Sequence, residues 1–247
     1  LFQERDFRPY WFETGTPTFL LDWIKAHHVW LPELAALRVS GDLLQAFDVD
    51  MMLTESLMFQ TGYLTIAKRE YQFGEYLYQL RYPNREVYQS FHNSVLYVLQ
   101  PDAGQSSRTK HQLGQLLLKN DFAGMEALFH SLFSSIPYDW QRNNAIAQYE
   151  GYYASVFYSY FAALGLDIRL EDITNKGRID MAVLFNQQVY LFEFKVVEAT
   201  PQGKALQQLQ DRGYAEKYRS RGEPIHLIGI EFSREQRNVV ACDYQLG

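Results

Sequence analysis

The run of residues 189–197, Val-Tyr-Leu-Phe-Glu-Phe-Lys-Val-Val, constrains the fold of this chain more than any other segment. Seven of its nine residues are apolar or aromatic, which is typical of a central strand buried on both faces of a sheet. Side chains alternate along a strand, so Glu193 and Lys195 share one face. Burying two charges is unfavourable unless they pair or contact a metal ion. The segment therefore predicts a central strand with one chemically specialised face.

The preceding strand is expected to supply a second carboxylate. Asp180 lies in the predicted strand 178–185, and turn-forming residues at 186–188 connect that strand to 189–197. Asp180 and Glu193 are offset from this turn by similar numbers of residues, so a hairpin brings them together. Two convergent carboxylates are suitable ligands for Mg²⁺. A nearby ammonium, here that of Lys195, can orient or help to deprotonate an attacking water.

Residues 138–247 are expected to form a compact α/β domain. Its predicted elements are a helix at 143–164 that ends at Gly165, strands at 167–174, 178–185 and 189–197, a helix at 202–220, and strands at 225–232 and 238–243. The order is therefore α-β-β-β-α-β with one further strand.

Residues 1–137 are expected to form a mainly helical region. The predicted elements are helices beginning near Thr16, at 51–60, after Pro83, at 109–119 and at 121–134, with short strands at 63–66 and 76–80. The helix–hairpin–helix arrangement is similar to a winged helix. The Ser-Ser-Ile-Pro sequence at 134–137 is the predicted boundary between the two regions.

The motif Gly177-Arg178-Ile179-Asp180, then twelve residues, then Glu193-Phe194-Lys195 resembles the signature of the PD-(D/E)XK nuclease superfamily. The order of predicted elements is similar to that superfamily's shared core. The resemblance implies a restriction-endonuclease-like domain with a mixed sheet. It also implies that Asp180, Glu193 and the carbonyl of Phe194 hold Mg²⁺ or Mn²⁺. Lys195 would orient the attacking water or help to deprotonate it. Ile179 replaces the proline of the motif's name, which removes no ligand.

Further residues of this resemblance have supporting roles. Glu150, on the apolar face of the first helix, would complete the metal site; the alternative is an acid favoured by the helix N-terminus. Gln210 and Tyr214 resemble a Gln-x-x-x-Tyr element of some branches, and Gln208 lies on the same helix. Which glutamine points inward stays open, and both have a solvent or structural alternative. Arg178, inside the motif, is a candidate substrate or support residue.

The resemblance extends outside the nuclease-like core. Residues 10–20, 59–66 and 82–87 look like parts of bacterial AAA-ATPase-like proteins that carry a nuclease-like domain at the C-terminus, and residues 190–195 and 213–218 match the C-terminal part of the same proteins. This implies that residues 1–137 are the end of an ATPase-like module whose core lies upstream of Leu1. The sequence contains no phosphate-binding Gly-x-x-x-x-Gly-Lys-Ser/Thr motif.

Charge places a nucleic-acid site in the second half of the chain. The net charge is −6 overall, but residues 141–247 hold 12 Lys/Arg against 13 Asp/Glu, whereas residues 1–140 hold 11 against 16. Basic residues of the predicted helix 202–220 and its end either follow a phosphate backbone or form a solvated face; they are Lys204, Arg212, Lys217, Arg219 and Arg221. One cysteine, Cys242, excludes an internal disulfide. No apolar run is long enough for a membrane span, so a cytoplasmic location is expected.

The leading hypothesis is a metal-dependent nuclease acting on nucleic acid, with DNA preferred. The alternative is a catalytically inactive nuclease-fold module that binds nucleic acid or a partner and is attached to an ATPase-like protein. A third hypothesis assigns the function to residues 1–135 as a winged-helix-type adaptor. The sequence leaves DNA against RNA, endo against exo cleavage and the oligomeric state open, a homo-oligomer included.

Overall fold

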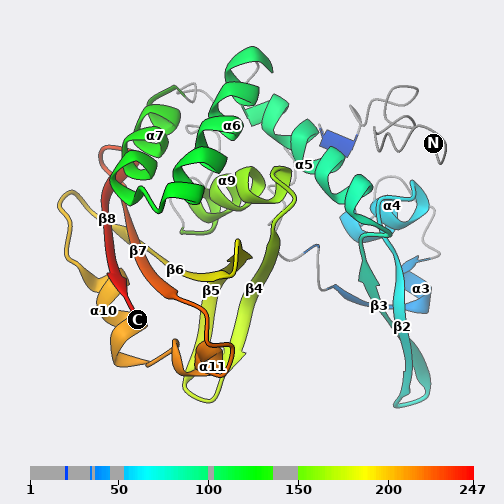
Figure 1. Ribbon diagram of the computed structural model, residues 1–247. Helices are drawn as coiled ribbons and strands as arrows, with labels where there is room; N and C mark the ends of the chain where they lie inside the picture. The colour runs from blue at the N-terminus through cyan, green and yellow to red at the C-terminus, as the bar shows by residue number, and fades with distance from the viewer. Residues whose placement is uncertain (1–19, 22–33, 35–36, 45–52, 100–102, 136–149) are drawn as a thin grey trace. The chain divides into compact units, whose positions relative to one another are not determined.

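The computed structural model describes residues 20–21, 34, 37–44, 53–99, 103–135 and 150–247 (Figure 1). The chain divides into two compact units, Leu1–Val98 and Leu99–Gly247. In the described ranges no helix is long and apolar enough to cross a membrane.

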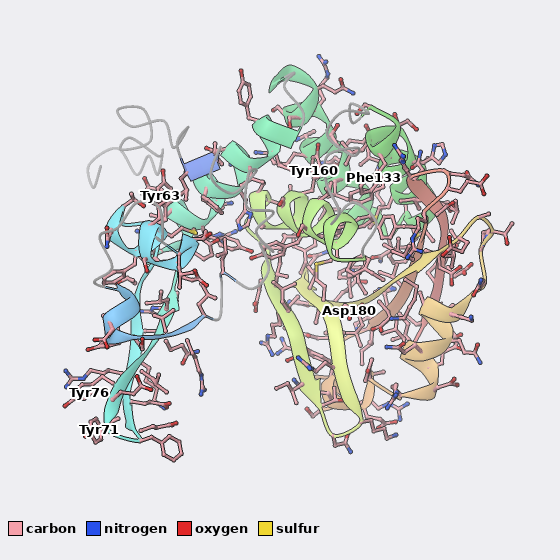
Figure 2. The ribbon with its side chains drawn as sticks, turned by 180° about the vertical axis from the view of Figure 1, so that it is seen from behind. Tyr63, Tyr71, Tyr76, Phe133, Tyr160 and Asp180 are labelled. Carbon is pink, nitrogen blue, oxygen red and sulfur yellow. The ribbon has the colours of Figure 1, made fainter. Side chains whose placement is uncertain are left out.

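The first unit contains a small antiparallel sheet between helices. Its elements are β1 (Arg38–Ser40), α3 (Gly41–Leu44), α4 (Thr54–Gln60), β2 (Thr65–Gln72), β3 (Glu75–Arg81) and α5 (Arg85–Leu99), and the strand order is β1-β3-β2. Tyr71 and Tyr76 pair across the tip of the β2–β3 hairpin with ring centroids 5.1 Å apart (Figure 2). The Asn84 side chain accepts a 2.9 Å hydrogen bond from the Val87 N–H and so caps α5. The predicted helix, hairpin and helix are present, and β1 is an addition that the sequence pattern did not predict.

The second unit is built on one mixed five-stranded sheet. Its strands are β4 (Asp167–Thr174), β5 (Gly177–Phe185), β6 (Gln188–Val197), β7 (Ile225–Ser233) and β8 (Asn238–Leu246), ordered β4-β5-β6-β7-β8. Only β6 and β7 pair in parallel among these strands; the other neighbours are antiparallel. The central strand β6 is therefore paired on both edges, as its apolar composition predicts. A mixed sheet in an α/β unit is the predicted restriction-endonuclease-like architecture.

Helices cover both faces of this sheet. Helices α6 (Ala103–Lys119), α7 (Phe122–Ser135) and α9 (Glu150–Ala163) gather on one side (Figure 1). Aromatic rings fill that interface: Phe161 lies 5.3 Å from Phe192, and Phe157 lies 5.4 Å from Phe194. On the other face, α10 (Lys204–Asp211) and α11 (Glu216–Arg219) pack over residues such as Leu191. The alternation of β6 side chains thus divides an aromatic face from the face that carries Glu193.

The two compact units do not divide at the predicted boundary of 134–137. Helices α6 and α7 belong to the second unit, because α7 packs on β8 and Phe133 lies 5.4 Å from Phe232. The Tyr190 hydroxyl on β6 also donates a 2.7 Å hydrogen bond to the Asn120 side chain in the turn between the two helices. Helices far from the sheet in sequence complete its aromatic face, which a local pattern does not reveal.

The predicted helix 202–220 is wrong in one respect, because it forms two helices, α10 and α11. Gly213 lies between them with a φ of +57°, a left-handed conformation that ends a helix. The predicted helix 143–164 is observed as α9 from Glu150, and its first seven residues lie outside the described part of the chain. The helix predicted from Thr16 also begins outside it.

Candidate active site

Asp180 reaches β6 at the point where the β5–β6 ladder ends. The last pair of that ladder is Met181 with Phe192, so Asp180 and Glu193 are the next opposed positions. Beyond the ladder the Phe194 N–H is no longer used by a β5 carbonyl, and it donates a 2.9 Å hydrogen bond to Asp180 Oδ2 instead. Figure 2 shows Asp180 within the sheet of the second unit. The predicted hairpin therefore brings Asp180 beside the segment that carries Glu193.

Glu193 is a buried carboxylate with an ammonium beside it. Its side chain is 1% exposed, and Lys195 Nζ lies 3.4 Å from Glu193 Oε1. The Lys195 side chain is 29% exposed, so it is partly open to solvent whereas Glu193 is not. The ammonium offsets part of the cost of burying a carboxylate at this place.

Gln208 on α10 is a further donor to Glu193. Its side-chain amide donates a hydrogen bond to Glu193 Oε1. Gln210, two residues later, points elsewhere: its amide donates to the Gln245 side chain on β8, at an exposed position. The question that the sequence left open is therefore answered, since Gln208 is the glutamine that faces the site.

Tyr214 lies beside the same carboxylates. It is 2% exposed, and a Cβ added at Gly177 would lie 2.6 Å from its hydroxyl oxygen. Burial raises the pKa of Tyr214, and the negative charges of Glu193 and Asp180 raise it further, whereas Arg212 and a hydrogen bond with Gln208 oppose the rise. The hydroxyl is therefore protonated at neutral pH and belongs to the polar cluster around Glu193.

Two residues of β7 fix the position of α10 over the site. Gly229 is in register with Glu193, and any side chain there would collide with the backbone of Leu206. Glu231 is fully buried and accepts hydrogen bonds from the Lys204 N–H at 2.7 Å and from the Gln202 and Ala205 N–H groups. Neither Gly229 nor Glu231 was predicted from the sequence, although Glu231 shows the same signal as Glu193, an acid inside an apolar strand.

The other predicted site residues are placed less centrally. Arg178 is exposed on β5, two residues before Asp180, and pairs with Ile173 on β4. Glu150 is the first residue of α9, but its side chain lies outside the described part of the structure. Its predicted contribution to a metal site therefore stays a prediction.

The donor set fits a hard divalent cation. Asp180 and Glu193 offer carboxylate oxygens, and Phe194 presents its main chain at the edge contacted by Asp180. Among the described residues there is no group of three or more His, Cys, Asp or Glu that could hold a metal ion. Two carboxylates suit Mg²⁺, because this ion keeps several waters and binds through one or two carboxylates together with substrate phosphate.

Comparison with known proteins points to the same region. Residues 148–242 match the family model described as PD-(D/E)XK nuclease superfamily. Over 240 residues the chain is 60% identical to a protein of Azotobacter chroococcum mcd 1 described as "Uncharacterized protein in vnfD 5'region", covering 97% of this chain and 46% of that protein. The chain thus spans less than half the length of this curated relative. No solved structure matches. The part of the chain that carries Asp180, Glu193 and Lys195 is thus similar to the PD-(D/E)XK nuclease superfamily in both sequence and fold.

Proposed function

We propose that the second unit is a Mg²⁺- or Mn²⁺-dependent nuclease that hydrolyses phosphodiester bonds of nucleic acid, with DNA the preferred substrate. One observation carries the proposal: Asp180, Glu193 and Lys195 converge at the end of the β5–β6 ladder, with the Lys195 ammonium 3.4 Å from Glu193. The match of residues 148–242 to a nuclease superfamily supports it.

Each residue has a chemical role in this proposal. Asp180, Glu193 and the Phe194 carbonyl would hold the cation, which when bound stabilises negative charge developing on the phosphate. Lys195 orients the attacking water through its ammonium. The water oxygen bonds to phosphorus and gives up a proton to solvent, while the bond from phosphorus to the leaving sugar oxygen breaks and that oxygen takes up a proton from solvent. Gln208 holds the Glu193 carboxylate in one orientation.

Cleavage of labelled DNA and RNA in Mg²⁺ or Mn²⁺ tests the proposal. We expect cleavage by the wild-type chain, its loss on chelation, and a fall of at least about 100-fold for Asp180→Ala and for Lys195→Met. Circular dichroism would verify that both variants are folded. Metal titration by calorimetry is an independent measurement, and a chain that binds neither ion would sink the catalytic assignment.

The alternative is an inactive nuclease-fold module, and the observation behind it is that the described residues contain no group of three or more His, Cys, Asp or Glu that could hold a metal ion. Nucleic-acid binding without cleavage across a substrate panel would support this alternative. The attachment to an ATPase-like module is a separate proposal that rests on the resemblance of residues 10–20, 59–66 and 82–87. Comparison of ATP hydrolysis by this chain and by a chain extended upstream of Leu1 tests it.

A further inference from the structure

Two turns of the second unit, far apart in sequence, lie against each other beside the active site. Arg212, in the turn between α10 and α11, donates a 2.9 Å hydrogen bond to the carbonyl of Lys176 in the β4–β5 turn. A Cβ added at Gly213 would lie 3.1 Å from Lys176 Nζ. The fold therefore brings the exposed cations Lys176 and Arg212 together.

These two cations are mounted on rigid backbone. The Thr174 hydroxyl donates to the Gly177 carbonyl at 3.0 Å and accepts a 3.2 Å hydrogen bond from the Lys176 N–H. The Arg212 bond to the Lys176 carbonyl ties the second turn to the first. A ligand that contacts both side chains would therefore meet a preformed backbone and would order only the side chains.

The cationic pair adjoins the active site through Tyr214. The Tyr214 hydroxyl lies against Gly177, the neighbour of Lys176. The pKa of Tyr214 is raised by burial and by Glu193 and Asp180, and lowered by Arg212, so one side chain senses both the carboxylates and this cation. An extended polyanion contacting a cation held by Asp180 and Glu193 can therefore continue over Lys176 and Arg212.

Ion pairing separates these two residues from three cations that follow Arg212 along the chain. Lys217 Nζ lies 2.5 Å from Asp172, Arg219 lies 3.1 Å from Glu216, and Arg221 lies 2.6 Å from Glu223. Within the described residues, neither Lys176 nor Arg212 has a carboxylate within 4.0 Å. The positive charge of Lys176 and Arg212 is therefore available to an external anion, whereas that of the three paired cations is already used.

We propose that Lys176 and Arg212 bind backbone phosphate of a nucleic-acid strand next to the phosphate that is cleaved. This inference rests on the proposed function and adds the direction in which the strand leaves the site, over the β4–β5 turn. The contacts are with phosphate, so they contribute affinity and register but no sequence preference.

The test is binding of fluorescein-labelled DNA duplex and single strand, followed by anisotropy in the full chain. An Asp180→Asn background prevents cleavage during the titration. Affinity is measured between roughly 50 and 200 mM salt, because each phosphate contact contributes about 0.9 to the slope of log affinity against log salt. The variant is Lys176→Ala with Arg212→Ala. The matched control, Arg219→Ala with Arg221→Ala, removes the same charge from ion-paired positions of the same segment.

We expect the Lys176/Arg212 variant to lose about two units of salt slope for every DNA sequence tested, and the control variant to keep the wild-type slope. Equal slopes in the two variants, or no binding by the parent chain, would overturn the inference. Competition separates the ligand sources: unlabelled DNA should displace the probe, whereas displacement by inorganic phosphate at equal phosphate concentration would indicate a site for small anions. Cleavage that persists in the Lys176/Arg212 variant with unchanged KM would remove this inference and leave the proposed function intact.

Discussion

At the scale of single residues, the Glu193 carboxylate is the most constrained group of the site. It is buried, and donors reach its Oε1 from two directions, Lys195 on the same strand and Gln208 on α10. A carboxylate held in this way presents its oxygens at a fixed place, which is what a metal ligand requires. The contribution of Gln208 can be separated from that of helix α10 itself, because Gln210 provides a matched comparison.

Replacing Gln208 with Ala should lower metal affinity and cleavage by about 10- to 100-fold, since residues that orient a metal ligand commonly have effects of this size. Gln210→Ala removes the same side chain from the same helix but only an exposed contact with Gln245. That variant should keep wild-type cleavage. Steady-state cleavage and calorimetric Mn²⁺ titration of both variants measure the difference. Equal losses of cleavage and metal affinity in the two variants would show that α10 contributes only through its packing on the sheet.

His92 in α5 makes the first unit sensitive to acid. It is buried among aromatic rings, with Tyr88 4.8 Å away and Phe91 5.2 Å away. Burial lowers the pKa of His92 from 6.5 to about 3. Below pH 6.5 His92 is therefore protonated in the unfolded chain but stays neutral in the folded chain. The free energy of unfolding decreases as the pH falls towards 3.

At pH 5 the His92 effect should cost about 2 kcal/mol of unfolding free energy relative to pH 7. Urea unfolding followed by circular dichroism at the two pH values measures it. A His92→Phe variant keeps an aromatic ring without the titration, so it should show a smaller loss. If the two chains lost the same free energy on acidification, His92 would not be the group responsible.

Residue-level prediction from sequence succeeded where the rules are local. Strand alternation and hairpin register are local, and they were enough to bring Asp180 and Glu193 together. The choice between Gln208 and Gln210 is not local. It depends on the rotation of α10, which is set by contacts of its first residues with Glu231 on a later strand.

At the scale of elements, the close approach of α10 to β7 is the feature that determines the geometry of the site. Gly229 permits that approach, because an added Cβ would meet the helix backbone, which cannot rotate away as a flexible side chain can. Glu231 ties the start of the helix to the same strand. One strand thus sets both the distance and the position of α10.

Gly229→Ala should destabilise the chain by about 1 to 3 kcal/mol and reduce cleavage, because α10 must move away from β7. Gly114→Ala is the control: in α6 an added Cβ meets only the end of the Leu164 side chain, at 3.3 Å. There the better helix propensity of alanine should leave stability unchanged or raise it by up to about 1 kcal/mol. Thermal unfolding and cleavage of both variants give the comparison.

The elements themselves were predicted with uneven success. The strands of the second unit agree with the alternating and apolar patterns, and β4 has the predicted bounds. The break between α10 and α11 was missed, because Gly213 in a polar helical segment looks like a tolerated glycine until its positive φ is known. Strand β1 was missed because three residues are too few to show a period.

At the scale of the whole molecule, the two compact units differ from the two regions that the sequence predicted. Helices α6 and α7 belong to the second unit, where α7 packs on β8 and α6 packs on α7 and α9. A local sequence pattern does not show this packing, because the contacting residues are far apart in the chain: Asn120 lies 70 residues before its partner Tyr190. The predicted boundary followed the Ser-Ser-Ile-Pro sequence at 134–137, whereas the division into two compact units follows packing.

A fragment of residues 99–247 should therefore unfold cooperatively and keep any cleavage activity of the chain. A fragment of residues 138–247 should lack a cooperative transition, since it loses Phe122 and Phe133 of α7, which pack on Tyr190 and Phe232 of the sheet. Urea unfolding and binding of the dye ANS measure both fragments. A cooperative transition in the shorter fragment would restore the boundary at 134–137.

The single parallel pair of the described sheet, β6 with β7, also has a consequence for how the site comes into being. Joining two parallel strands requires a crossover, and here the crossover is α10 and α11, which carry Gln208 and Tyr214. Gly229 and Glu231, which hold that crossover, are synthesised after Asp180, Glu193 and Lys195. On a ribosome, Asp180, Glu193 and Lys195 would emerge before β7, the strand that positions helix α10. A nascent chain would therefore carry the reactive residues without the contacts that orient them until β7 has joined the sheet.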